Sequence, residues 1–207
     1  MLETPAGKEH IAVGADGEGY GICDLNPFVE YHDYAEFGDS GNWNPATVVN
    51  QTANSVKIAR NTSDGVWTLI QTFTQVAGKS PSVRIAMTLK NNTPQVRSVF
   101  LIRYADVDAG GAVLNSLDGT AKSAFGWNSN ASSDPFGLVL QNAGAFPAAI
   151  EPAGFTQNVP QGPDACNFVT HFAPGTQTAT DGSIALLYGL NISKGAPQTV
   201  TVSYKGL

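Results

Sequence analysis

Three long apolar segments follow one another in the middle of the chain and restrict its fold more than any other feature. They span residues 66–76, 83–89 and 96–108, with Gly- and Pro-containing turns between them. Apolar and polar residues alternate in the second segment, which is typical of a strand with one buried face. The third segment has apolar residues on both faces, which indicates a central strand covered on both sides. We therefore expect an antiparallel meander of three long strands.

Shorter strands joined by turns rich in Gly and Pro account for the rest of the sequence, and almost no helix is expected. The pattern predicts an all-β fold: a large antiparallel β-sandwich of two packed sheets, formed by residues 1–207 as a single domain. One hairpin is expected from residues 10–13 and 20–25. Another is expected to close the fold, from residues 183–192 and 198–205.

This layout resembles the large β-sandwiches of galactose-mutarotase-like proteins and of polysaccharide-lyase accessory domains. The strand end at Leu89–Thr93 also resembles those of immunoglobulin-like modules. No catalytic residue of these families matches a residue of this chain, so the resemblance implies a fold and not an activity.

The composition restricts the partners that the protein can have. Charged residues make up only 14% of the chain, and the formal net charge is -6. Lys and Arg total 11 and form no cluster along the sequence, which argues against nucleic acid as a partner. No apolar run approaches the ~20 residues of a membrane-spanning helix.

A surface built mainly from Asn, Gln, Ser, Thr and Gly is common in exported β proteins. The first residues carry no signal peptide, so we expect a secreted, periplasmic or cell-surface protein whose leader has been removed. The two cysteines, Cys23 and Cys166, fit one disulfide, which would stabilise the fold by roughly 4–5 kcal/mol through the unfolded-state entropy. Two buried free thiols are the alternative.

Carboxylates at the end of the third long segment form the first candidate site. Asp106 and Asp108 are two residues apart and project from one face of a strand, and Asp118 can fold back towards them past Gly110–Gly111. Such hard oxygen ligands suit Ca²⁺, and two carboxylates can also act as general acid and base on a sugar. The structural alternative is that they pair with Arg103 or cap backbone amides.

Residues 28–45, an acidic and aromatic segment, form the second candidate. The segment lacks a clear period of two and predicts a loop with at most a short helix. Exposed rings beside carboxylates suit a sugar, because the rings stack on the pyranose and the polar groups bind its hydroxyls. The alternative is that the rings fill the open end of the sandwich. The ligand-binding residues that we expect are Tyr31, Tyr34, Trp43, Tyr104 and Trp127.

Histidine chemistry is the third candidate. His32 is a candidate general base beside Asp33, although adjacent residues on a strand face opposite ways. His10 and His171 are the other histidines, and structural roles are the alternative for all three. None of the common hydrolase, zinc or phosphate-binding motifs occurs in the sequence.

Three classes of function remain open on these grounds. The first is an exported β-sandwich module that binds carbohydrate or another neutral ligand. The second is an enzyme that acts on a sugar or a small neutral substrate, with Asp106, Asp108 or His32 as acid and base. The third is a structural protein that assembles through the closing hairpin.

Overall fold

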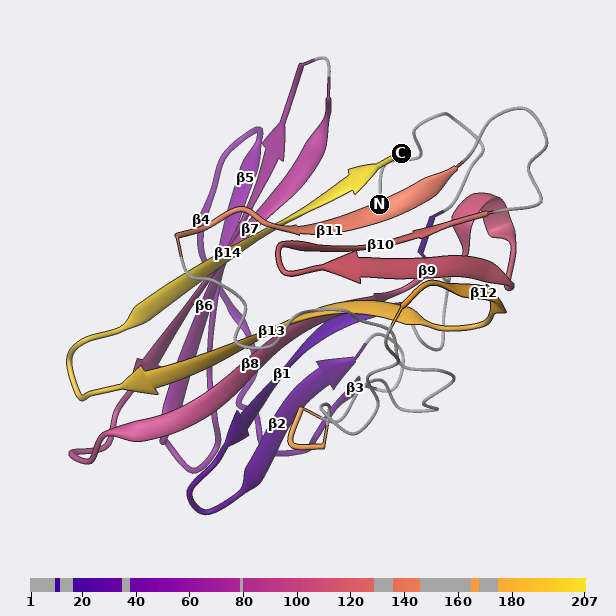
Figure 1. Cartoon of the computed structure of the whole chain (residues 1–207). Helices are drawn as coiled ribbons and strands as arrows, with labels where there is room; N and C mark the ends of the chain where they lie inside the picture. Colours follow the sequence, from indigo (N-terminus) through magenta and orange to yellow (C-terminus); the bar gives the residue numbers. More distant parts are fainter. Residues whose placement is uncertain are drawn as a thin grey trace.

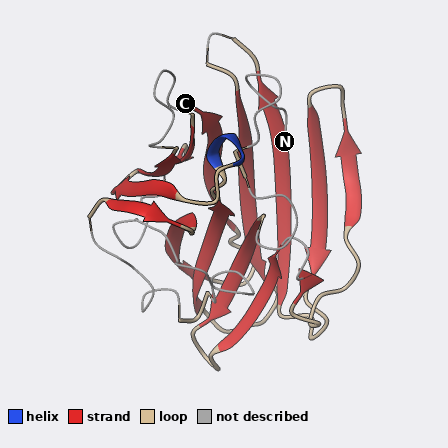
Figure 2. Ribbon diagram, turned by 90° about the vertical axis from the view of Figure 1, so that its right-hand side faces the viewer, coloured by secondary structure: helices blue, strands red, loops and turns tan. Residues whose placement is uncertain are grey.

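The computed structural model describes residues 10–11, 17–34, 38–78, 80–128, 136–145, 165–167 and 175–207. Within these residues the chain forms two packed antiparallel sheets of five and nine strands, and the only helical element is a 3₁₀ turn, η2 (Ala109–Gly111) (Figure 1). The two layers are also visible after rotation by 90° (Figure 2). The prediction of an all-β sandwich is confirmed.

Each sheet has a simple order of strands. The five-stranded sheet consists, in order, of β13 (Ser183–Ile192), β8 (Arg97–Asp106), β1 (Glu18–Asp24), β2 (Val29–Tyr34) and β3 (Gly38–Asp39). The nine-stranded sheet consists, in order, of β12 (Gln177–Thr180), β9 (Asn115–Thr120), β10 (Ser123–Trp127), β11 (Gly137–Asn142), β14 (Gln198–Gly206), β7 (Ser82–Asn91), β6 (Trp67–Val76), β5 (Ser55–Asn61) and β4 (Thr47–Gln51).

The main core lies between the two sheets, where alternate residues of each strand point inward. Trp67, Leu69 and Met87 of the nine-stranded sheet are buried there with Leu101 of the five-stranded sheet. This is the alternation that residues 83–89 predict. The same alternation occurs in the last two strands, whose inward residues are Ile184, Leu186, Tyr188, Leu190 and Ile192 of β13, and Val200, Val202 and Tyr204 of β14.

The third long strand occupies a different place from the one that the sequence predicts. β6 and β7 pair as expected, but the next neighbour of β7 is β14, and β8 lies in the other sheet between β1 and β13. The predicted meander is therefore wrong at its third strand. β8 buries Leu101 on one face and Ile102 on the other, so it is stabilised at the centre of a sheet covered on both sides. Its prediction as a central, doubly covered strand is confirmed.

Both predicted hairpins are wrong, because their strands pair elsewhere. β13 and β14 belong to different sheets, and residues 193–197 connect the two layers. β1 pairs with β8 on one side and β2 on the other, so it has no edge left for residues 10–13. Ile11 instead forms an isolated bridge with Val107.

A second apolar cluster lies on the outer face of the five-stranded sheet, away from the main core. It contains Cys23, Tyr34, Ile102, Tyr104, Ala165, Cys166, Ala185 and Leu187. Ala165 of the short segment 165–167 is fully buried there, next to Gly21 of β1 and hydrogen-bonded to Glu30 of β2. In the part of the chain that the structure describes, no helix has the length and apolar character needed to cross a membrane.

Candidate functional site

The acidic and aromatic segment forms a strand, which corrects the prediction of a loop with at most a short helix. Its residues 29–34 are β2, and they pair along their whole length with β1. Successive side chains of a strand point to opposite faces. Glu30, His32 and Tyr34 therefore lie on the outer face, while Tyr31 and Asp33 point towards the nine-stranded sheet.

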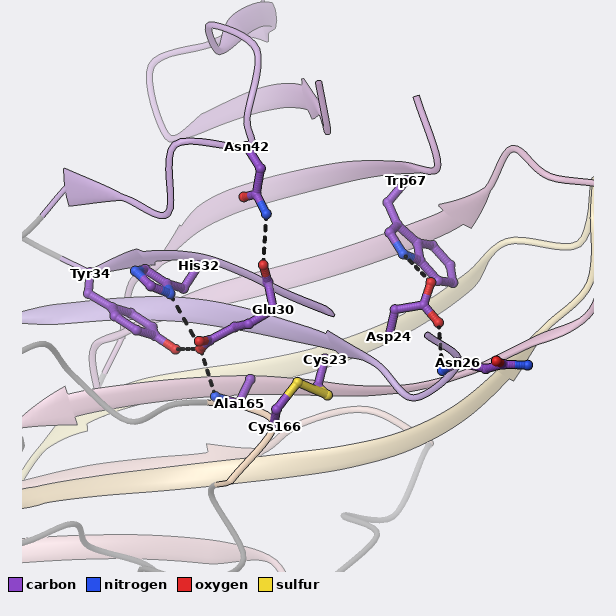
Figure 3. Close-up of a disulfide and its surroundings, with 10 residues drawn as sticks. All are labelled: Cys23, Asp24, Asn26, Glu30, His32, Tyr34, Asn42, Trp67, Ala165 and Cys166. Carbon is purple, nitrogen blue, oxygen red and sulfur yellow. Dashed lines mark hydrogen bonds and ion pairs between the residues drawn. A yellow bond between two sulfur atoms is a disulfide. The ribbon is translucent and has the colours of Figure 1, made fainter. Parts of the chain in front are cut away.

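Two side chains and one backbone N–H meet at a carboxylate on the outer face, and we call Glu30, His32, Tyr34 and Ala165 the Glu30 cluster (Figure 3). Glu30 Oε1 accepts hydrogen bonds from Tyr34 Oη at 2.9 Å and from the backbone N–H of Ala165 at 2.8 Å. His32 Nδ1 lies 3.3 Å from the same oxygen, at ion-pair distance when the imidazole is protonated. The cluster therefore holds a carboxylate and an imidazole together in a fixed geometry.

Aromatic packing fixes the orientation of the imidazole. The His32 ring lies flat on the Tyr34 ring, with 4.2 Å between centroids and an interplanar angle of 5°. Tyr34 packs edge-on against Tyr104 beneath it. Gly21 lies directly opposite His32, and a Cβ at this position would come within 2.6 Å of the Tyr34 hydroxyl and 3.0 Å of the Ala165 Cβ. A residue without a Cβ is thus required at position 21 for the Tyr34 hydroxyl and Ala165 to lie this close to β1.

The Glu30 cluster is partly open to solvent. The side chains of Glu30 and His32 are each 21% exposed, whereas Tyr34 is almost completely buried. Glu30 Oε2 and His32 Nε2 make no hydrogen bond to any residue within the described ranges. One carboxylate oxygen of Glu30 and one imidazole nitrogen of His32 are therefore available to a ligand. The aromatic rings of Tyr34 and Tyr104 lie beneath them.

The disulfide next to this cluster confirms the prediction for Cys23 and Cys166. The bond joins β1 to segment 165–167, and the two cysteines have a sequence separation of 143. It anchors the residue after Ala165, and so holds the Ala165 N–H against Glu30 (Figure 3).

The inward side of β2 carries two of the expected ligand-binding rings, and both are buried. Tyr31 packs edge-on against Trp43, and Tyr20 does the same from β1. Only 2% of Tyr31 and 7% of Trp43 is exposed. These rings fill the space between the sheets, which was the structural alternative, and cannot stack on a sugar from outside.

Tyr31 also makes a polar contact across the sandwich. Its hydroxyl donates a 2.6 Å hydrogen bond to Asp64, in the loop before β6, and burial is the largest cause that raises the pKa of Tyr31. Burial alone would raise the pKa of Asp64, but bonds donated by the hydroxyls of Thr62 and Tyr31 and by the Val66 N–H together lower it. Asp64 is therefore held as a carboxylate.

Asp64→Asn is expected to lower the free energy of unfolding at pH 7, and the difference from wild type should shrink as the pH falls below about 4. The folded-state pKa of Asp64 lies below the unfolded value, so its stabilisation is present above the unfolded pKa and is lost as the pH falls through the folded one. Urea denaturation at pH 7 and pH 3 measures this. Asp181→Asn, at a carboxylate without a hydrogen bond to any described side chain, is the control. An equal loss at both pH values would contradict the expectation.

Tyr104 and Trp127 lie on opposite sides of the molecule. Tyr104 is fully buried under the Glu30 cluster, so it supports the site without contacting a ligand. Trp127 is half-buried on the outer face of the nine-stranded sheet, where its ring lies 5.8 Å from that of Phe125. The five expected ligand-binding rings therefore do not form one surface.

The structure does not bring the three expected metal ligands together. Asp106 is 5% exposed and accepts a hydrogen bond from Ser183 Oγ at 3.4 Å, while Asp108 directly precedes η2. Asp118 lies in β9 and accepts a 2.5 Å hydrogen bond from Thr176. Among the described residues, no group of three or more His, Cys, Asp or Glu side chains could hold a metal ion. The expected Ca²⁺ site thus has no geometric support.

The remaining histidines do not add to the Glu30 cluster. His10 is buried beside the ring of Phe136, at 6.3 Å between centroids. His171 lies outside the described residues. Of the expected catalytic residues, His32 lies 3.3 Å from a carboxylate oxygen, and this oxygen belongs to Glu30 rather than to the adjacent Asp33.

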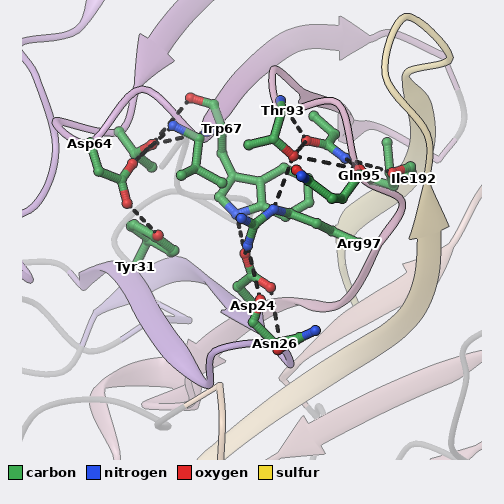
Figure 4. A network of polar contacts seen from close by, with 12 residues as sticks. Asp24, Asn26, Tyr31, Asp64, Trp67, Thr93, Gln95, Arg97 and Ile192 are labelled. Carbon is green, nitrogen blue, oxygen red and sulfur yellow. Dashed lines mark hydrogen bonds and ion pairs between the residues drawn. The ribbon is translucent and has the colours of Figure 1, made fainter.

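A second polar network joins the two sheets at the end of β1 and is structural (Figure 4). Asp24 is completely buried, and its Oδ2 accepts hydrogen bonds from Trp67 Nε1 at 3.2 Å and from Arg97 Nη1 at 2.5 Å. The backbone N–H of Asn26 donates to Oδ1. Both oxygens of the carboxylate accept hydrogen bonds from the protein and Asp24 has no exposed surface, so we assign the network a structural role.

The second arginine of β8 is also satisfied inside the sandwich. Arg103 is 2% exposed and pairs with Glu18, while its Nη1 donates to Gln71 at 3.0 Å. Its guanidinium also lies over the rings of Phe73 and Tyr204. Arg97 and Arg103 therefore pair with Asp24 and Glu18, so the alternative that the carboxylates at the end of β8 pair with Arg103 is not what the structure shows.

Two packed antiparallel sheets, with a polar cluster on the outer face of the smaller one, define this chain as a large β-sandwich protein. A bacterial glucoamylase, solved in complex with acarbose, has a similar fold: the TM-score is 0.52 and the sequence identity 8%. The match covers 93% of this chain and 28% of the glucoamylase chain, so the present chain spans less than a third of that protein. No protein-family model and no curated protein sequence matches the chain.

Glu30 is one of the carboxylates of the acidic and aromatic segment, which the sequence offers as polar groups for sugar hydroxyls. The sequence does not pair it with His32, because a segment expected to be a loop gives no reason to group the two. The spacing of Glu30, His32 and Tyr34 at every second residue was the available signal, since such residues share one face of a strand.

Proposed function

We propose that this chain is an exported β-sandwich module that binds a neutral carbohydrate at the Glu30 cluster. The proposal rests on the contact between the Glu30 carboxylate and the His32 imidazole, which are both partly exposed to solvent. A carboxylate accepts hydrogen bonds from sugar hydroxyls, and an imidazole nitrogen can donate or accept one. A neutral sugar brings no charge into the site, so the charges of the Glu30 carboxylate and the His32 imidazole stay as they are without ligand.

Two further observations support this proposal. A similar sandwich occurs in a glucoamylase that was solved with acarbose, which agrees with a role related to sugars. A disulfide persists mainly in oxidising compartments, so the Cys23–Cys166 bond agrees with export.

Glu30→Gln is expected to weaken carbohydrate binding by roughly tenfold or more, because hydrogen bonds to a charged group are worth more than neutral ones. Isothermal titration calorimetry with neutral oligosaccharides, chosen by a glycan array, measures the loss. Asp181→Asn makes the same change of charge near the far end of β13 and should bind as wild type does. Absence of binding to every neutral glycan tested would refute the proposal.

The same contact favours a second candidate, an enzyme that acts on a sugar. A carboxylate and an imidazole at 3.3 Å can move a proton between them and a bound hydroxyl. In that case Glu30→Gln would abolish turnover and leave most of the binding intact. Turnover that survives in both Glu30→Gln and His32→Gln would exclude this candidate.

A further inference from the structure

The outer face of the nine-stranded sheet carries a distinct set of side chains over β5, β6, β7 and β14. The register places Lys57 opposite Thr72, Thr72 opposite Ala86, and Ala86 opposite Thr201. Paired residues of an antiparallel sheet share a face. The neighbours of these residues along each strand, such as Met87 and Val200, are buried in the core, so this row points to solvent.

On the part of this face that β5, β6, β7 and β14 form, every charged side chain is cationic, and we call Lys57, Arg84, Lys90 and Lys205 the cationic face. Arg84, Lys90 and Lys205 are exposed and Lys57 is half-buried. One nitrogen of Arg84 donates to the carbonyl of Ala143 at 2.9 Å. These four strands contain no Asp or Glu, and none occurs in residues 40–63, 65–105 or 182–207. In a chain of net charge -6, the register places one carboxylate, Asp118 of β9, on the same side of the sheet, in the row of Lys205 and three strands away from it.

The hydroxyl groups of Ser and Thr side chains lie between and beside the cations. Thr88 and Thr199 are within hydrogen-bond distance of each other at 2.7 Å, and Ser55 and Thr74 at 3.4 Å. The face also carries the side chains of Thr68, Thr72, Thr201 and Ser203. These hydroxyls supply donors and acceptors beside the cations, while Ala59, Ile70 and Ala86 are apolar side chains of the same face.

The cations are spaced along a diagonal of the sheet. Arg84 lies opposite Ser203, and Lys205 is two residues further along β14, so the two Cα atoms are about 8 Å apart from the strand spacing and rise. Lys57 lies two strands and two residues from Arg84, or about 12 Å. An extended chain that crosses the strands obliquely would meet one cation after another.

We propose that the cationic face binds an acidic polysaccharide, a polymer of uronic acid residues, through charge complementarity. The carboxylates of the polymer pair with Arg84, Lys205 and Lys57, and its hydroxyls bond to the threonines between them. Nucleic acid fits less well, since a duplex carries one charge per roughly 1.7 Å and needs a denser array of cations. The cationic face and the Glu30 cluster lie on opposite outer faces of the sandwich, so the proposal is independent of the proposed function.

Polygalacturonate of defined length is the probe, with dextran of equal length as the neutral comparison. Binding to wild type at 50 mM salt is expected for polygalacturonate only, and its affinity should fall as salt is raised. The double variant Arg84→Glu/Lys205→Glu should bind roughly tenfold more weakly or worse. Lys122→Glu/Lys194→Glu makes the same change of net charge in two turns outside the diagonal, and should stay within about twofold of wild type.

Three outcomes would overturn the proposal. The first is no binding of polygalacturonate at 50 mM salt by a wild type that is folded. The second is an equal loss in both double variants, which would mean attraction by net charge alone. The third is tighter binding of a single-stranded RNA of the same length, which would assign the face to nucleic acid. Neutral oligosaccharide binding at the Glu30 cluster is measured separately and should not change in either double variant.

Discussion

Replacement of Arg97 by methionine is expected to destabilise the fold by about 3–5 kcal/mol, because it leaves a buried carboxylate without its cation. Asp24 has no exposed surface, and Arg97 Nη1 is its one cationic partner among the described residues. The remaining donors, Trp67 Nε1 and the Asn26 N–H, are neutral. Urea denaturation at pH 7 measures the loss.

A double-mutant cycle shows whether the loss comes from the unpaired charge. Asp24→Asn removes the charge and keeps the acceptor for Trp67, so Asp24→Asn/Arg97→Met should be more stable than Arg97→Met alone. Arg84→Met, at an exposed arginine, is the control and should change the stability by less than about 0.5 kcal/mol. A double variant that loses the sum of the two single losses would show that the pair is not coupled.

The sequence predicts the strands of this fold better than their partners. The alternation in residues 83–89 and the two apolar faces of β8 depend on local burial, and both predictions are confirmed. Pairing depends on which edges remain free in three dimensions. β14, from the end of the chain, occupies the edge of β7 that the sequence assigns to β8, and no local pattern records that competition.

In the candidate site, too, the sequence predicts some of the residues but not the contacts that bring them together. His32 and Tyr34 are predicted as site residues, but the residue that joins them, Glu30, becomes evident only once β2 is known to be a strand. Ala165 completes the cluster from 135 residues away, through a backbone N–H that no side-chain motif encodes. Residue type alone does not separate Tyr31 from Tyr34, since the two rings differ only in the face of β2 from which they project.

The cationic face extends this reasoning to electrostatics. Along the sequence its four cations are distributed over three separate strands, β5, β7 and β14, and form no cluster. Antiparallel pairing places three of them along one diagonal of neighbouring strands, because two-residue periodicity directs them all to the same face. A clear signal remains in the sequence all the same, namely the absence of Asp and Glu from residues 65–105.

Removal of the disulfide by Cys23→Ala/Cys166→Ala is expected to lower the free energy of unfolding by about 5 kcal/mol. The bond closes a loop of 143 residues, and the chain-entropy model gives this magnitude for such a loop. Alanine is the better replacement because Cys23 is fully buried, and a serine hydroxyl there would need a partner. Urea denaturation of the double variant, against the oxidised wild type, measures the change. A loss below about 2 kcal/mol would contradict the expectation.

The disulfide is also expected to act on the Glu30 cluster, because it anchors the residue next to Ala165. Without the bond, the Ala165 N–H is no longer held 2.8 Å from Glu30 Oε1, and the carboxylate loses one of its two hydrogen-bond donors. Carbohydrate binding should therefore fall in the cysteine variant under conditions where it is still folded. In a Glu30→Gln background the same cysteine replacements should cause a smaller further loss, since they act through Glu30. Independent, additive losses would show that the bond stabilises the sandwich without positioning the site.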